Sequence, residues 1–283
     1  MSEPRRISLC CADLGNLPRA AVEYLVLNLN TRQRQVEFEF LPVSATSPLL
    51  SPLGPGALIS LDQFHRRATE LVARVAQDME HQSAAYRLPK PSLGRMVFVS
   101  LATLDGHYYY IYEPEYSAIF LGDWNTKMAP PSILESLLTL IIREGIYALV
   151  PNTTAGLTHY ATRGCVGDFN ASLRDTRYKV LQGFLCSECR GSVEAAVGSE
   201  ACAAWTALLG KSWIGTVADS TSPATIVKKL GYNLFLTEGF APTYRERFLQ
   251  LLQEDGTKEF LKLVSAVLAA VLAAAILLWL KLK

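Results

Sequence analysis

The sequence predicts an α+β fold that ends in a transmembrane helix, and three features of the chain lead to this prediction. Polar and apolar residues alternate in QVEFEFL, residues 35–41, as they do in a half-buried strand. Two prolines and a serine introduce a strongly apolar run that ends at Val150, and prolines suit the first turn of a helix. A second apolar run, residues 263–280, carries no charge and lies near the C-terminus.

The remaining elements follow in order along the chain. Residues 42–58 are rich in serine, proline and glycine and are interpreted as a loop, after which Ser60-Leu-Asp-Gln is typical of a helix start. Strands are predicted over residues 5–14, 35–41, 95–101, 107–112 and 118–121, and helices over residues 17–27, 60–79 and 131–150.

The C-terminal third of the sequence predicts helices rather than strands. Residues 193–258 are expected to be helical, with interruptions at glycine and proline positions. These positions are Gly210, Pro223 and Pro242. The chain is therefore expected to comprise three parts, which are a first domain over 1–192, a helical connecting region over 193–258 and a C-terminal anchor over 259–283.

Charge and the N-terminal sequence limit the partners and the compartment of the chain. The 283 residues include 27 basic and 26 acidic side chains, for a net charge of +1. This balance gives no reason to expect a nucleic-acid partner. The start, MSEPRRISLCC, has no apolar run of signal-peptide length, so the bulk of the chain is expected in the cytoplasm with reduced thiols. Clustered cysteines then favour metal binding over disulfides.

The apolar run over residues 263–280 has the length of a membrane span. Its 18 residues would form a helix of about 27 Å, close to the hydrocarbon thickness of a bilayer. Only three residues follow it, so we expect a single-pass tail anchor in the cell membrane that contacts lipid. A buried helix is the alternative, but the run is apolar on every face. Ala266, Ala270 and Ala274 recur at a spacing that favours self-association of membrane helices.

Four potential metal ligands are arranged as two pairs. His159, Cys165, Cys186 and Cys189 give the pattern H-x5-C-x20-C-x2-C. Three thiolates and one imidazole complete a tetrahedral zinc site and leave no position for a water molecule, so the predicted zinc is structural. Two alternatives stay open at this point. The cysteines can be buried reduced thiols, and His159 can be a loop histidine that binds no metal.

The cysteine segment, CVGDFNASLRDTRYKVLQGFLCSEC, resembles the zinc-knuckle segment of the archaemetzincin-type metallopeptidases. That family combines the motif HExxHxxGxxH with a second zinc bound by cysteines. The N-terminal RRISLCCADLGNLP, and the strands that precede the helix over 131–150, fit the same pattern. The resemblance extends over residues 5–191, and it implies a zincin-like mixed sheet with packed helices and a zinc knuckle.

The catalytic motif of that family is degenerate in this chain. The corresponding helix reads REGIY, with Arg143 and Tyr147 at the positions of the two zinc-binding histidines. Arginine keeps a permanent positive charge and does not bind Zn²⁺. Glu144 alone matches the motif and is the one candidate for a catalytic residue. The alternative is that Glu144 is a solvated charge or a member of a buried ion pair.

These observations favour a non-catalytic, zinc-stabilised, tail-anchored protein that serves as an interaction platform or sensor. A protein partner is expected, and a bacterial signalling or defence assembly is a plausible setting. One alternative is an effector whose anchor helices oligomerise and perturb the membrane. The other is a hydrolase that uses a zinc beside Glu144, or Cys165 as a nucleophile with His159 or His107 as its base.

Overall fold

The computed structural model describes residues 3–87, 93–150, 157–160, 164–170, 172–232, 237–238 and 241–242. The chain divides into two compact units, Met1–Ala241 and Pro242–Lys283, and nearly all of the described residues belong to the first. The predicted membrane anchor, residues 263–280, lies outside the described residues. Among the helices that the structure describes, none has the length and apolarity needed to cross a membrane.

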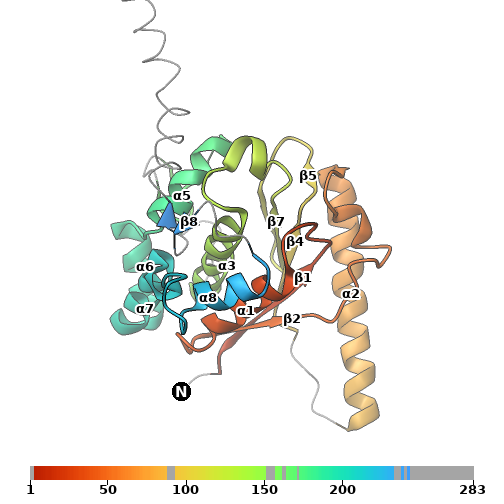
Figure 1. The fold of residues 1–283 in the computed structure, drawn as a ribbon. Coiled ribbons are helices and arrows are strands. Elements are labelled where there is room, and N and C mark those ends of the chain that lie inside the picture. Colours follow the sequence, from red (N-terminus) through yellow and green to blue (C-terminus); the bar gives the residue numbers. More distant parts are fainter. Residues whose placement is uncertain are drawn as a thin grey trace, which may run out of the picture. The chain divides into compact units, whose positions relative to one another are not determined.

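A five-stranded mixed sheet forms the centre of the first unit (Figure 1). In spatial order its strands are β2 (Val36–Phe40), β1 (Arg5–Cys11), β4 (Arg95–Ser100), β7 (Tyr116–Phe120) and β6 (Tyr110–Tyr112). The first four strands run parallel to their neighbours, and β6 runs antiparallel to β7 at the edge. The sheet is therefore mixed, as predicted from the sequence.

Successive side chains of the central strands enter two different hydrophobic cores. Leu9 and Val97, which are opposite each other in β1 and β4, belong to one core, whereas their neighbours Cys10 and Phe98 belong to the other. Parallel strands that are covered on both faces are apolar on both faces. Helix α2 (Leu61–Tyr86) covers one face, and α1 (Arg19–Leu29) and α3 (Ile133–Leu149) cover the other (Figure 1).

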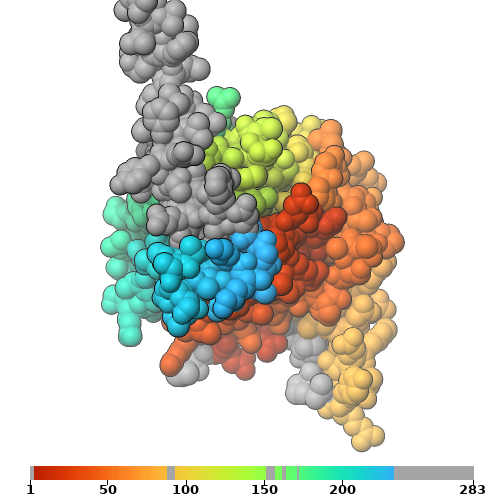
Figure 2. All heavy atoms as spheres, viewed as in Figure 1, coloured from red at the N-terminus to blue at the C-terminus, as the bar shows by residue number. Residues whose placement is uncertain are grey.

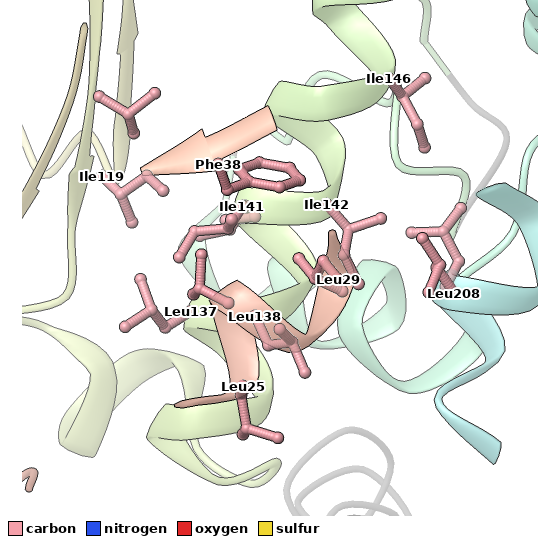
Figure 3. Close-up of a cluster of buried hydrophobic side chains, with 14 of the residues drawn as sticks. Leu25, Leu29, Phe38, Ile119, Leu137, Leu138, Ile141, Ile142, Ile146 and Leu208 are labelled. Atoms are coloured by element: carbon pink, nitrogen blue, oxygen red, sulfur yellow. The ribbon is translucent and has the colours of Figure 1, made fainter. Parts of the chain in front are cut away.

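Helix α3 is buried along almost its whole length. Its first turn is fixed by a reciprocal cap, because the Ser132 side chain accepts from the backbone of Glu135 while the Glu135 side chain accepts from the backbone of Ser132. Figure 3 shows how side chains from α1, β2, β7, α3 and α7 meet around it. The labelled residues include Leu25, Leu29, Phe38, Ile119, Leu137, Ile141 and Leu208. The helix thus lies between the sheet and a further layer of helices.

The outer helical layer belongs to the same core as α3. It contains α5 (Thr176–Gln182), α6 (Ser187–Val197), α7 (Ser199–Gly210) and α8 (Pro223–Lys229). Val193, Trp205 and Val227 from these helices are buried in the core that also holds α1 and α3. Figure 2 shows α8, in blue, at the surface beside the N-terminal elements, in red and orange. Helices α6, α7 and α8 are therefore packed on the elements that precede residue 193.

Several short elements and boundaries were not predicted. The two-residue strands are β3 (Leu58–Ile59), β5 (Thr103–Leu104), β8 (Thr237–Glu238) and β9 (Ala241–Pro242). Helix α1 begins two residues later than predicted because Pro18 occupies its N-cap with extended dihedral angles. The strand predicted over 107–112 is shortened to β6, since His107 has a left-handed φ of 58° that a strand does not accommodate.

Candidate metal centre

Four side chains from three separate stretches of chain meet beside α3 and form a group that can hold a metal ion. They are His159, Cys165, Cys186 and Cys189, and their ligand atoms all lie within 4.8 Å of one another. A tetrahedral site with zinc–sulfur bonds of about 2.3 Å holds its sulfurs about 3.8 Å apart. The four atoms thus need only small movements to surround a zinc ion.

Local backbone structure explains why the three cysteines converge. Cys165 pairs with Phe184 in an isolated β-bridge, so the two halves of the segment lie side by side. Cys186 is the N-cap of α6 and Cys189 lies in its first turn, which places both sulfurs at the same end of the helix. The backbone N–H of Cys186 donates to Cys165 Sγ over 3.3 Å. A backbone donor of this kind stabilises a thiolate.

His159 is oriented by a carboxylate toward the sulfurs. Its Nδ1 lies 2.9 Å from Asp168 Oδ1, and its Nε2 lies 3.3 Å from Cys186 Sγ. Metal-binding histidines usually donate their second ring N–H to such a carboxylate, which fixes the ring and its tautomer. Asp168 was not predicted from the sequence, because nothing in the spacing separates it from other loop aspartates. The arrangement favours His159 as a ligand over an unattached loop histidine.

A glycine makes room for the close approach of the ligands. A Cβ atom at Gly167 would lie 2.2 Å from the carbonyl oxygen of Leu157, 2.9 Å from Cys189 Sγ and 3.3 Å from His159 Nε2. Only glycine fits at this position without displacing the ligands. Gly167 was also missed, since single glycines are common in loops that hold no metal.

The thiol chemistry of the cluster is that of a site for a divalent cation. A hydrogen bond from Cys189 lowers the pKa of Cys165 to about 5, even though burial acts in the opposite direction. The same hydrogen bond raises the pKa of Cys189, with burial as the second cause. The Cys165 thiol is therefore the more acidic of the two. A zinc ion would displace the thiol protons and be held by both sulfurs as thiolates.

The helix positions expected for a hydrolytic zinc hold an arginine and a tyrosine. Arg143 Nη2 donates to the Tyr147 hydroxyl over 2.9 Å. The guanidinium carbon lies 4.0 Å from the ring centroid of Tyr110 and 4.4 Å from that of Tyr147. Both distances are within the range of cation–π contacts. The positive charge at these positions therefore comes from a side chain of the protein, Arg143.

Glu144 faces the sheet and is fully buried. Its Oε2 accepts from Ser117 Oγ over 2.6 Å and lies 3.8 Å from Arg95 Nε. Ser117 belongs to β7 and Arg95 to β4. The contacts are those of a buried ion pair with a supporting hydrogen bond, which is the non-catalytic alternative for this residue.

A buried lysine connects the two regions. Lys179 Nζ donates to the Tyr109 hydroxyl over 3.0 Å and to the backbone carbonyl of Asp168. Burial lowers the pKa of Lys179 well below its ordinary value, and the positive charge of Arg143 lowers it further. No motif or spacing around Lys179 indicates this role.

The geometry does not support the cysteine-nucleophile alternative with His107. The His107 Nδ1 lies 2.9 Å from Asp123 Oδ2, and its side chain is 60% exposed. His107 is not part of the four-residue group, whereas Cys165 is fully buried within that group. A thiolate that binds a metal is not free to attack a substrate.

Comparisons with known proteins found a similar solved structure but no matching family model. No protein-family model matches the chain, and no curated protein matches it. Among solved structures, the chain is similar to the crystal structure of archaemetzincin from Methanopyrus kandleri, with 13% sequence identity and a TM-score of 0.37. The match covers 70% of this chain and 98% of that one. That protein is of the family that the cysteine segment resembles, but a likeness at this level carries no argument about activity.

Proposed function

We propose that the chain is a zinc-stabilised, non-catalytic protein in which His159, Cys165, Cys186 and Cys189 bind one structural zinc ion. The convergence of the four ligand atoms within 4.8 Å is the observation that carries the proposal. The carboxylate of Asp168 behind His159 supports it, because this second contact orients metal-binding histidines. Four protein ligands fill a tetrahedral shell, so the ion stabilises the fold and activates no water.

The side chains of α3 support a non-catalytic role. A hydrolytic zinc on this helix would need imidazoles at positions 143 and 147, but the chain has a guanidinium and a phenol there. The carboxylate of Glu144 is engaged with Ser117 and Arg95. With Arg143 and Tyr147 in place of the two histidines, no metal-bound water is expected beside Glu144 for its carboxylate to deprotonate.

The same proposal includes membrane anchoring and a binding role. The support for anchoring is the length and uniform apolarity of residues 263–280, with a lysine on each side. Such an anchor would confine the zinc-stabilised unit to the cytoplasmic face of a membrane and raise its effective concentration for partners there. We propose that the unit acts at this surface as an interaction platform or sensor.

Metal content of the purified full chain tests the proposal. We expect one zinc ion per chain, measured by mass spectrometry of the metal, and its loss in Cys186→Ser. Cys202→Ser is the control, since Cys202 is more deeply buried than Cys186 in the same core but lies outside the ligand group. Two zinc ions per chain, or full retention of zinc in Cys186→Ser, would contradict the proposal.

A further inference from the structure

A cavity of about 310 Å³ lies between the metal centre and α3. Its walls include the side chains of Arg143 from α3, Asp168 from the metal-binding segment, and aromatic residues from the turn before β6. The aromatic residues of this turn are His107, Tyr108 and Tyr109, and Phe169 adds a ring from the metal-binding segment. The volume is at the lower end of the range for small-molecule sites.

Arg143 brings an incompletely satisfied charge to this cavity. The residue is only 5% exposed, yet neither Nε nor Nη1 has a hydrogen-bond partner within the described part of the chain. Guanidinium groups carry five N–H donors, and the Tyr147 hydroxyl accepts one of those on Nη2. Buried polar atoms are normally paired, so unpaired donors on a buried cation point to a missing acceptor.

Two tyrosine rings contact this guanidinium. The ring centroids of Tyr110 and Tyr147 lie 4.0 and 4.4 Å from its carbon atom. These contacts restrain the group and leave the donors on Nε and Nη1 for an acceptor. A planar edge of N–H donors matches a carboxylate, with two oxygens that can accept side by side.

The other walls restrict the ligand further. Tyr108, Tyr109 and Phe169 line the cavity, so aromatic side chains are available to contact a planar ring. Asp168 lines the same cavity with its own carboxylate, which pairs with His159. A second negative charge on the ligand would be repelled there, so a monoanion is favoured over a dianion.

We propose that this cavity binds a small aromatic carboxylate, whose anionic group accepts from the edge of Arg143 and whose ring lies among the tyrosines. A larger cavity, of about 550 Å³, adjoins residues that follow β1, β4 and β7, but no charged side chain is among its described lining residues. That cavity offers no counter-charge for an anion, which leaves Arg143 as the anchor.

The inference deepens the proposed sensor role, because it names the class of ligand that the unit would detect. The inference rests on the proposed sensor role, because a ligand matters only to a protein that detects it. Binding of the ligand can be measured whether or not that role is correct. Zinc content measures the metal centre, and ligand titration measures the cavity. A chain that binds zinc but no carboxylate, or the reverse, separates the two.

Calorimetric titration of the zinc-loaded full chain with benzoate tests the inference. We expect a dissociation constant on the order of 0.1–1 mM for a ligand of this size. Benzamide has the same shape without the charge and should bind at least about tenfold more weakly. Inorganic phosphate should also bind more weakly than benzoate. These two comparisons use the unaltered protein and so do not depend on the folding of a variant.

Two substitutions locate the site. Arg143→Met removes the charge at similar length and should weaken benzoate binding at least about tenfold. Tyr108→Ala should weaken it about threefold or more. Tyr86→Ala is the matched control, since both tyrosines are largely exposed but Tyr86 ends α2 and does not line the cavity.

Four results would overturn the inference. They are no heat of binding at about 10 mM benzoate, equal affinity for benzamide, tighter binding of phosphate than of benzoate, and unchanged binding in a folded Arg143→Met chain. If Arg143→Met does not fold, the Tyr108→Ala and Tyr86→Ala pair decides, and equal effects in these two variants would reject the site.

Discussion

The metal centre and the middle of helix α3 are adjacent regions that both bury polar side chains, but they differ in where the balancing positive charge comes from. Each gathers polar side chains from distant parts of the chain into the protein interior. At the metal centre three sulfurs and an imidazole meet without a cation of their own. On α3 the cation is Arg143, which contacts two tyrosine rings.

The two regions therefore differ in whether they need a bound metal ion. Buried thiolates repel one another and need a positive ion at their centre. The α3 cluster already contains its positive charge, and a zinc ion there would be repelled by the guanidinium. One region thus offers ligands for a metal ion, whereas the other contains a positively charged side chain.

Removal of zinc should have the largest effect on stability. Structural zinc contributes on the order of 10 kcal/mol to folding, so a chelator should lower the free energy of unfolding by several kcal/mol. Urea denaturation of the full chain with and without chelator measures this, and added zinc should restore the original midpoint. An unchanged midpoint would mean that zinc does not stabilise the fold, and the proposed difference between the metal centre and α3 would then be wrong.

Gly145→Ala should destabilise the α3 side without loss of zinc. A Cβ atom there would lie 2.3 Å from Trp205 Cη2 and 3.0 Å from Phe38 Cζ, so the core must shift. Overpacking of this kind costs about 1–3 kcal/mol. Gly191→Ala, in α6, is the control, because no atom lies within 4 Å of its Cβ position and alanine favours a helix. Equal stabilities of the two variants would contradict the packing described for α3.

Glu144→Gln should be costly in stability and silent in any assay of hydrolysis. Glutamine loses the charge that faces Arg95 and weakens the acceptor for Ser117, at a cost of about 1–2 kcal/mol. Glu39→Gln is the control, since Glu39 also accepts from a serine, Ser8, over 2.6 Å but is only half-buried. We expect a cost below about 1 kcal/mol for that variant. A hydrolytic activity that disappears only in Glu144→Gln would reverse the interpretation of α3.

Lys179 links the two regions, and its titration makes their stability depend on pH. The pKa of Lys179 is lowered in the folded state, so between that value and the ordinary 10.5 the unfolded chain binds more protons than the folded chain. Stability that depends on Lys179 therefore rises with pH in this window, with a slope of at most about 1.4 kcal/mol per pH unit.

The comparison of wild type with Lys179→Met isolates this contribution. We expect the wild type to gain stability relative to the variant as the pH is raised from 7 to 10, a range chosen to approach the unfolded pKa of about 10.4. Urea midpoints of both zinc-loaded proteins measure the difference. A difference that stays constant, or that shrinks with rising pH, would mean that Lys179 is not desolvated in the folded protein.

The sequence predicts the ligand set well because the signal is local. The pairs His159/Cys165 and Cys186/Cys189 have spacings that chemistry restricts, and the structure brings all four together. The strands were predictable for a similar reason, since alternation and apolar runs report burial directly, whereas the mixed order of the sheet was implied only by the resemblance of the cysteine segment. The helix cap at Ser132 is also predictable from the residues that follow it.

The features that the sequence did not predict depend on contacts between distant residues. Arg143 meets Tyr110 across 33 positions, Glu144 meets Ser117 across 27, and Lys179 meets Tyr109 across 70. No local pattern encodes such pairs. The two-residue strands β3 and β5 were missed because they are too short to show periodicity.

X-ray absorption at the zinc edge of the full chain tests the central claim most directly. We predict a shell of three sulfurs at about 2.3 Å and one nitrogen at about 2.0 Å, with no water ligand. A shell made only of nitrogen and oxygen at about 2.0 Å would place the ion away from the cysteines and contradict the account.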